Sequence, residues 1–103
     1  MNNTNYIGSV AKVLELPIQN ILQKNVLMTE FRVQLPQARN SNIVNLVFWG
    51  NLANDIRKYY KPNDYIIIEG YISTRNKIYN DLTPSNIKKV EITVLKVYPI
   101  SLN

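Results

Sequence analysis

Apolar and polar residues alternate along several stretches of this chain, and such alternation is typical of β-strands with one buried face. The clearest stretch is 26–35, where the two faces separate: Phe31, Val33 and Leu35 lie on one side and Glu30, Arg32 and Gln34 on the other. Further strands are predicted over 6–16, 42–49, 64–79 and 87–100. We expect the intervening polar segments to be connections, including 17–24, 36–41 and 80–86.

The stretch 42–49 has two different faces. An all-apolar set is expected in the core and a mixed set on an open sheet surface: Val44, Leu46 and Phe48 against Ile43, Asn45, Val47 and Trp49. Trp49 is the only tryptophan of the chain and it ends this strand. An aromatic side chain there is a candidate platform for base stacking.

A helix is predicted over 51–61, between the third and fourth strands. Apolar residues recur there at helical spacing, at Leu52, Ala53, Ile56, Tyr59 and Tyr60. We expect Tyr59 and Tyr60 to be packing contacts, and Pro62 to end the helix. A strand, a short helix and a further strand in this order indicate an all-β, five-stranded OB-fold barrel, with the helix closing one end.

Chain length and one glycine add to this fold prediction. The 103 residues suit one domain over 1–103, with a short disordered N-terminus at about 1–5. Gly70 lies inside the predicted fourth strand, where it indicates a bend or a close backbone approach in a curved sheet.

Composition excludes many catalytic sites. The chain has no cysteine and no histidine, so disulfides, Cys/His zinc sites and imidazole catalysis are ruled out. The carboxylates show no pairing motif, and the three glycines are isolated rather than grouped in a phosphate-binding loop. We therefore expect no enzyme activity and no metal or organic cofactor. A net charge of +5 makes anionic partners more probable than for a neutral chain.

The sequence shows no targeting or membrane-spanning segment. Its first residues lack a basic start and an apolar stretch, and no run approaches the roughly 18 apolar residues of a membrane span. We therefore expect no membrane association. The abundance of Asn, Ile, Lys and Tyr, which have AT-rich codons, suggests an organelle or a reduced bacterium as the source.

Two segments carry a resemblance to a known family. Leu46–Ala53 reads Leu-Val-Phe-Trp-Gly-Asn-Leu-Ala, and Tyr59–Arg75 includes Glu69-Gly70 and ends in Thr74-Arg75. This pattern resembles the bacterial-type single-stranded DNA-binding proteins, in which an aromatic-Gly-x-Leu-Ala strand end leads into the helix. The resemblance extends loosely over about 6–100. In length and composition the chain is most similar to the short plastid-encoded members, so the plastid stroma is the expected location, with the bacterial cytoplasm as the alternative.

The resemblance implies an OB barrel that coats single-stranded DNA in replication, recombination or repair, with little sequence specificity, as a dimer or tetramer. Trp49 matches a stacking aromatic of the family, whereas Ile43 stands where many members carry a tryptophan. The family match, the residues expected on the outer sheet face and the basic residues near it together give the predicted nucleic-acid-binding set. This set is Trp49, Asn45, Arg32, Tyr71, Arg75, Lys77, Tyr79 and Lys88. The chain ends without the acidic tip through which many members recruit repair enzymes.

Three alternatives remain open at this point. RNA could replace DNA, because base stacking does not register the 2′-hydroxyl. The chain could be a primosome-like accessory OB protein, which its short loops also suit. It could also be an OB protein-interaction subunit that binds no nucleic acid and buries its mixed face against a partner.

Overall fold

The computed structural model describes residues 5–36, 42–77 and 87–100, with the backbone alone at 42, 75–77 and 87–89. Along the chain it contains β1 (Tyr6–Val13), β2 (Ile18–Ile21), the 3-10 turn η1 (Gln23–Asn25), β3 (Leu27–Leu35), β4 (Asn42–Trp49), α1 (Gly50–Tyr59), β5 (Tyr65–Lys77) and β6 (Ile87–Pro99). Within these ranges no helix is long and apolar enough to cross a membrane. The expected disorder at 1–5 and the loop at 80–86 lie almost entirely outside the described residues.

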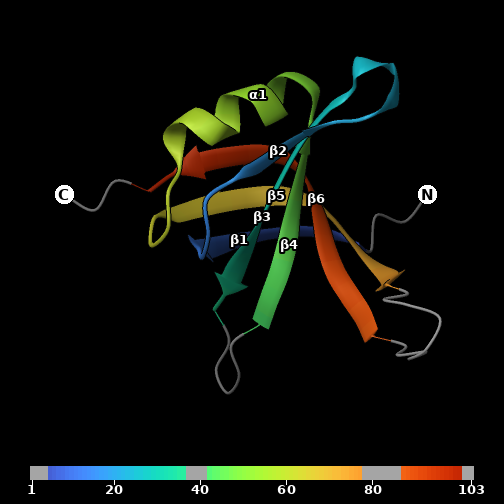
Figure 1. The fold of residues 1–103 in the computed structure, drawn as a ribbon. Helices are drawn as coiled ribbons and strands as arrows, with labels where there is room; N and C mark the ends of the chain where they lie inside the picture. Colours follow the sequence, from blue (N-terminus) through green and yellow to red (C-terminus); the bar gives the residue numbers. More distant parts are fainter. Residues whose placement is uncertain (1–4, 37–41, 78–86, 101–103) are drawn as a thin grey trace.

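The strands form a closed barrel (Figure 1). The sheet order is β1-β5-β6-β4-β3-β2, and an additional β1–β3 pairing joins the two sides. The β4–β6 pair is parallel and the other pairs are antiparallel. Five strands therefore close around one core with a helix between the third and fourth of them, and the predicted OB-fold is confirmed.

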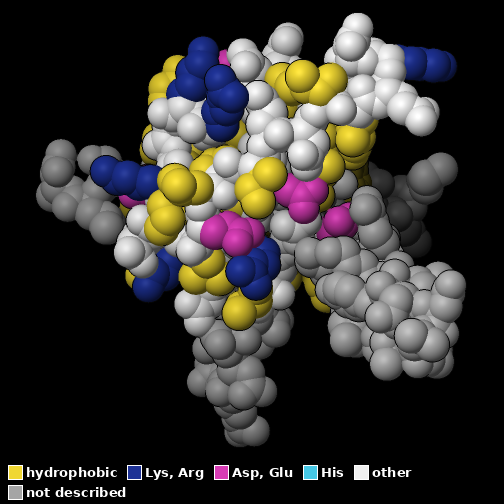
Figure 2. Space-filling model, in the orientation of Figure 1, with side chains coloured by type: hydrophobic (Ala, Val, Ile, Leu, Met, Phe, Trp, Pro, Cys, Tyr) yellow, Lys and Arg dark blue, Asp and Glu magenta, His cyan; other side chains and the backbone are white. Residues whose placement is uncertain are grey.

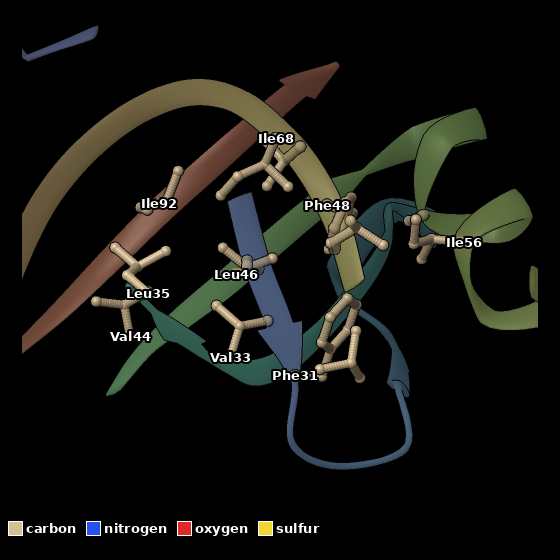
Figure 3. Packing of buried hydrophobic residues seen from close by; sticks show 14 residues of the cluster. Phe31, Val33, Leu35, Val44, Leu46, Phe48, Ile56, Ile68 and Ile92 are labelled. Atoms are coloured by element: carbon tan, nitrogen blue, oxygen red, sulfur yellow. The ribbon is translucent and has the colours of Figure 1, made fainter. Parts of the chain in front are cut away.

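The barrel interior holds the apolar faces predicted from the alternation. Phe31, Leu46 and Phe48 are fully buried, and the two phenylalanine rings stack with centroids 5.3 Å apart. Side chains from β3, β4, β5, β6 and α1 point toward one another in this core (Figure 3). Burying each such side chain contributes about 1.5 to 3 kcal/mol, so the shared apolar face explains why these strands curl around a common centre.

The short strand β2 was not predicted from the sequence. It pairs with β3 from Ile18 opposite Glu30 to Ile21 opposite Leu27, and the backbone N–H of Leu22 donates to the Val26 carbonyl at 2.8 Å. The segment was expected to be a connection because its residues do not alternate between apolar and polar. In the structure they are mostly exposed. Backbone pairing with β3, rather than a buried face, holds β2 in place.

The helix α1 lies over one end of the barrel (Figure 1). It begins at Gly50, whose φ of 64° turns the chain sharply out of β4. Ala53 and Ile56 are buried in the core and Tyr60 packs against it. Tyr59 is 70% exposed, so its predicted packing role is wrong. At the end of the helix Tyr59 points away from the barrel, and only its neighbour contributes to the core.

One buried hydrogen bond fixes α1 to the barrel. The Thr29 hydroxyl donates to the Ala53 carbonyl at 2.6 Å, and Thr29 is fully buried. We expect Thr29→Val to lower the free energy of unfolding by about 1 kcal/mol, because it removes the hydrogen bond while keeping a similar shape. Urea unfolding followed by circular dichroism measures this. Thr74→Val, at an exposed position of β5, is the matched control, and equal stabilities for the two variants would contradict the assigned role.

Gly70 marks the closest approach between β5 and β6. The register of the two strands shifts between Glu69 and Gly70, and a Cβ atom built on Gly70 would lie 2.1 Å from the Thr93 carbonyl oxygen. The predicted close approach in a curved sheet is therefore confirmed. Only a residue without a side chain allows the two backbones to meet there.

Candidate nucleic-acid interface

The outward side of β4 is open at its ends and covered in its middle. Ile43 is 57% exposed and Trp49 is 41% exposed, whereas Asn45 and Val47 are each 3% exposed. The expectation that the sheet surface is open at Asn45 is therefore wrong. β4 runs between β3 and β6, so the middle of the strand has a neighbouring strand on each side, and Arg32 and Glu91 flank Asn45.

One row of neighbouring residues connects all six strands across the outer surface. Strand pairing places the following residues side by side in this order: Ile18, Glu30, Val47, Thr93, Tyr71 and Tyr6. Trp49 lies one step beyond Val47 on the same side of β4. The structure therefore brings Tyr71 onto the surface that carries Trp49, separated from it by β6.

Tyr71 is paired with a second tyrosine. Its ring lies 5.3 Å from that of Tyr6 in an edge-to-face arrangement, and Tyr71 is 39% exposed. The Tyr6 hydroxyl donates to Glu69 Oε1 at 2.9 Å, and this hydrogen bond raises the pKa of Tyr6. Tyr6 therefore remains a neutral phenol at physiological pH, and the two rings form an aromatic platform that is partly open to solvent.

Trp49 stands at the point where β4 becomes α1. It is the N-cap residue of the helix and keeps an extended backbone, with φ of −121° and ψ of 148°. Its side chain lines an open hollow of about 480 Å³ together with Leu22, Gln23 and Val26 from the β2–β3 connection. The sequence predicted the exposed tryptophan. It did not predict these three neighbours. The available signal was the pair of apolar residues, Leu22 and Val26, on either side of the polar turn.

Arg32 is already paired within the protein. Its backbone N–H donates to Glu15 Oε1 at 2.8 Å, and its guanidinium donates to Glu15 Oε2 from Nε at 3.2 Å and from Nη2 at 3.1 Å. The carboxylate raises the pKa of Arg32 further, so the guanidinium stays charged. The Arg32 side chain is nevertheless 55% exposed. A phosphate approaching it would compete with Glu15 for the same donors.

Acidic residues occupy the middle of this surface. Glu30 is half-buried opposite Val47, Glu91 is 8% exposed beside Asn45, and the Asn45 amide lies 3.5 Å from Glu30 Oε1. Figure 2 shows acidic side chains and an adjacent basic side chain near the centre of the face in view. The alternation of Glu30 with Arg32 already placed an acid on this face, but the sequence-based set counted only the cations. In the described ranges no group of acidic residues is arranged to hold a metal ion.

The remaining predicted cations lie on the β5–β6 hairpin. Arg75 pairs with Lys89, Asn76 with Lys88 and Lys77 with Ile87. The backbone thus brings four basic residues to the ends of two neighbouring strands, on the ladder that also carries Tyr71. Their side chains, and the whole of Tyr79, lie outside the described residues.

Comparisons with known proteins agree on one family. Residues 1–100 match the model of the single-strand binding protein family. The protein ycf41 of Trieres chinensis, provisionally named a single-stranded DNA-binding protein, is 38% identical over 103 residues, which cover 96% of this chain and 91% of ycf41. The thylakoid-associated single-stranded DNA-binding protein slr1034 of Synechocystis is 46% identical over 44 residues, or 40% of this chain and 34% of slr1034.

Solved structures of the same kind superpose well. The SSB domain of a Synechococcus protein has a TM-score of 0.74 and 26% identity, covering 95% of this chain and 98% of that domain. A small single-stranded DNA-binding protein of Streptomyces coelicolor has a TM-score of 0.77 and 14% identity, covering 92% of this chain and 93% of that protein. The second of these likenesses concerns the fold alone.

Proposed function

This chain belongs to the single-strand binding protein family, and we propose that it binds single-stranded DNA through the outer surface that runs from Trp49 to Tyr71. The carrying observation is the exposure of Trp49 at an open, apolar-lined end of β4. Stacking on an aromatic ring is tolerant of sequence, because every base has a π-face. Binding with little sequence specificity follows, and it suits protection of transient single strands in replication, recombination or repair.

The charges on this surface indicate how a strand would run. Glu30, opposite Val47, repels phosphates from the middle of the surface, whereas the basic residues of the β5–β6 hairpin attract them toward its end. We therefore place the bases over the aromatic residues and the phosphates along the rim. Each neutralised phosphate releases condensed counterions, so the affinity should fall as salt rises.

The test of this function is a titration of Trp49 fluorescence with oligo-dT at low and high salt. One tryptophan in the chain reports one site. Saturable quenching that weakens with salt and is not produced by duplex DNA supports the proposal. Unchanged emission, together with a gel-shift that also shows no binding, would reject DNA coating and favour the protein-interaction alternative.

The Glu15–Arg32 ion pair predicts a variant that binds single-stranded DNA more tightly than the wild type. We expect Glu15→Gln to tighten oligo-dT binding by a few-fold, because it frees the Arg32 guanidinium for a phosphate, and to steepen the salt dependence by up to about one unit of slope. Fluorescence titration across a salt series measures both. Asp55→Asn makes the same change of charge on the exposed side of α1. Equal tightening in both variants would show a general charge effect and not the release of Arg32.

We also propose self-association of this chain. Exposed apolar residues gather on β1, β5 and β6: Val10, Tyr65, Ile67, Leu95 and Tyr98 are each at least 38% exposed. Contiguous apolar surface of this kind marks interaction sites. A dimer or tetramer would cover it, and light scattering at increasing protein concentration measures the mass.

The relatives bear on the source of the protein. Similarity to ycf41 and to a thylakoid-associated cyanobacterial protein indicates an organellar or cyanobacterial origin. Within that origin we propose the plastid stroma as the place where the chain acts.

A further inference from the structure

We infer that the pocket at the C-terminal end of α1 binds a basic side chain, an arginine or a lysine, of a partner protein. The pocket has a volume of about 290 Å³ and forms where the end of α1, the turn into β5 and the end of β6 meet. We call it the tyrosine pocket, and its lining is Tyr59, Tyr60, Asn63, Asp64, Tyr65, Pro99 and Ile100. None of these residues belongs to the surface proposed for DNA, so this is a second binding site of the chain.

Hydrogen bonds hold the backbone around the tyrosine pocket in place. The Asn63 N–H donates to the Val13 carbonyl and the Val13 N–H donates to the Asp64 carbonyl, both at 2.8 Å, which ties the turn to the end of β1. The Ile100 N–H donates to the Tyr65 carbonyl at 3.3 Å, which ties the end of β6 to the start of β5. The end of α1, the start of β5 and the end of β6 thus lie together at one side of the barrel (Figure 1).

Three tyrosine rings give this pocket its aromatic surface. Tyr59 is 70% exposed and Tyr65 is 42% exposed, whereas Tyr60 is half-buried and packs against the core. Burial and the charge of Asp64 raise the pKa of Tyr60, so this residue stays a neutral phenol at physiological pH. The face of a neutral aromatic ring carries a negative partial charge and attracts cations. Tyr59, which does not pack in the core, therefore has a binding role here.

The charges at the tyrosine pocket favour a cation over a phosphate or a carboxylate. Asp64 is the one charged side chain among the described residues that line it. Its Oδ2 accepts the backbone N–H of Lys61 at 3.0 Å, and within the described ranges Oδ1 has no hydrogen-bond partner. The last carbonyls of α1 add the negative end of the helix dipole at the same place. A guanidinium or ammonium group lying against the rings would therefore also meet a carboxylate oxygen.

The cation has to come from another molecule. Lys58 and Lys61 are the basic residues nearest to the lining in sequence, and in the described part of the chain neither lines the pocket nor forms an ion pair with Asp64. The pocket opens to solvent beside Tyr59 and Tyr65. The backbone of a partner protein can therefore stay outside while one long basic side chain enters.

The test is a ¹⁵N NMR titration with N-acetyl-arginine amide, which detects weak binding residue by residue. N-acetyl-citrulline amide has nearly the same shape without the charge and is the control ligand. We expect saturable shifts of amide signals within 59–65 and at 100 with the arginine derivative alone. Tyr59→Ala should raise its Kd about threefold through loss of one cation–π contact. Asp64→Asn keeps an oxygen for the Lys61 N–H and should raise the Kd by up to about fivefold through loss of the charge.

Two matched variants control for general effects. Trp49→Ala removes an aromatic ring that is 41% exposed and lies outside the tyrosine pocket, and Asp55→Asn removes an exposed carboxylate of α1. Both should bind the arginine derivative as tightly as the wild type. The same spectra show whether each variant is folded, and if Asp64→Asn is not, Tyr59→Ala decides.

Three results would reject the inference. These are equal shifts with the arginine and citrulline derivatives, equal Kd values for Tyr59→Ala and Trp49→Ala, and loss of binding as the protein concentration rises, which would show that a second copy fills the pocket. The proposed function is tested separately. If the wild type binds no oligo-dT but still binds the arginine derivative, DNA binding is rejected and the tyrosine pocket stands.

Discussion

Replacing Trp49 with alanine should weaken binding of single-stranded DNA by about 1 to 3 kcal/mol, or roughly 5- to 150-fold in Kd. The indole is 41% exposed at the end of β4 and lines an open hollow together with Leu22 and Val26. Alanine removes the stacking surface. Trp49 lies at the rim of the barrel and not in its core, so the fold should survive the change.

The measurement uses a fluorescently labelled oligonucleotide and its anisotropy, because the variant has no tryptophan to observe. Trp49→Phe keeps an aromatic face and should retain most of the affinity. Tyr59→Ala removes an aromatic ring that is 70% exposed on α1, away from the proposed surface, and should change little. If Trp49→Ala binds as tightly as Tyr59→Ala, stacking at Trp49 is not a source of affinity.

Replacing Gly70 with alanine should destabilise the barrel by about 3 kcal/mol or more, the upper range for an overpacked site. The added Cβ would meet the Thr93 carbonyl oxygen at 2.1 Å and its carbon at 2.9 Å. Both atoms belong to the backbone of β6, so relief requires separating two paired strands and cannot come from a side-chain rotation. Small domains have only about 5 to 15 kcal/mol of stability, so this loss is large.

Gly8→Ala is the internal control for that prediction. Gly8 lies in β1, and a Cβ there would find its nearest atoms at 3.8 and 3.9 Å, which is ordinary contact. We expect its stability to stay within about 1 kcal/mol of the wild type. Urea unfolding of the two variants gives the comparison. A Gly70→Ala protein as stable as Gly8→Ala would contradict the close approach of β5 and β6.

The strands that share the core were predictable because burial leaves a pattern in the sequence. The alternation at Phe31 and Val33 reflects the inward side of β3, and both residues are fully buried. β2 leaves no such pattern, because its position depends on hydrogen bonds to β3 and not on an apolar face. Backbone pairing of a short exposed segment has no signature in side-chain type, which explains why it was missed.

The candidate site was less predictable than the fold. Alternation gives the direction of a side chain but not what its neighbours do. Asn45 points outward as expected, yet it is 3% exposed, and Arg32 and Glu91 of the neighbouring strands flank it. Arg32 was expected to be available for phosphate, but it is paired with Glu15, 17 residues earlier in the chain. Such contacts between distant segments depend on the closed barrel and cannot be read from local sequence.

The position of β6 in the sheet has a consequence for how the protein is made. β6 follows every other described strand in the sequence but lies between β5 and β4 in the sheet. While the ribosome is still synthesising β6, the edges of β4 and β5 that it will join have no partner, and the barrel cannot close. Pairing between such distant segments is slow, and unpaired strands aggregate easily. Until β6 inserts, the nascent chain therefore exposes two unpaired strand edges, one on each side of the gap that β6 will fill.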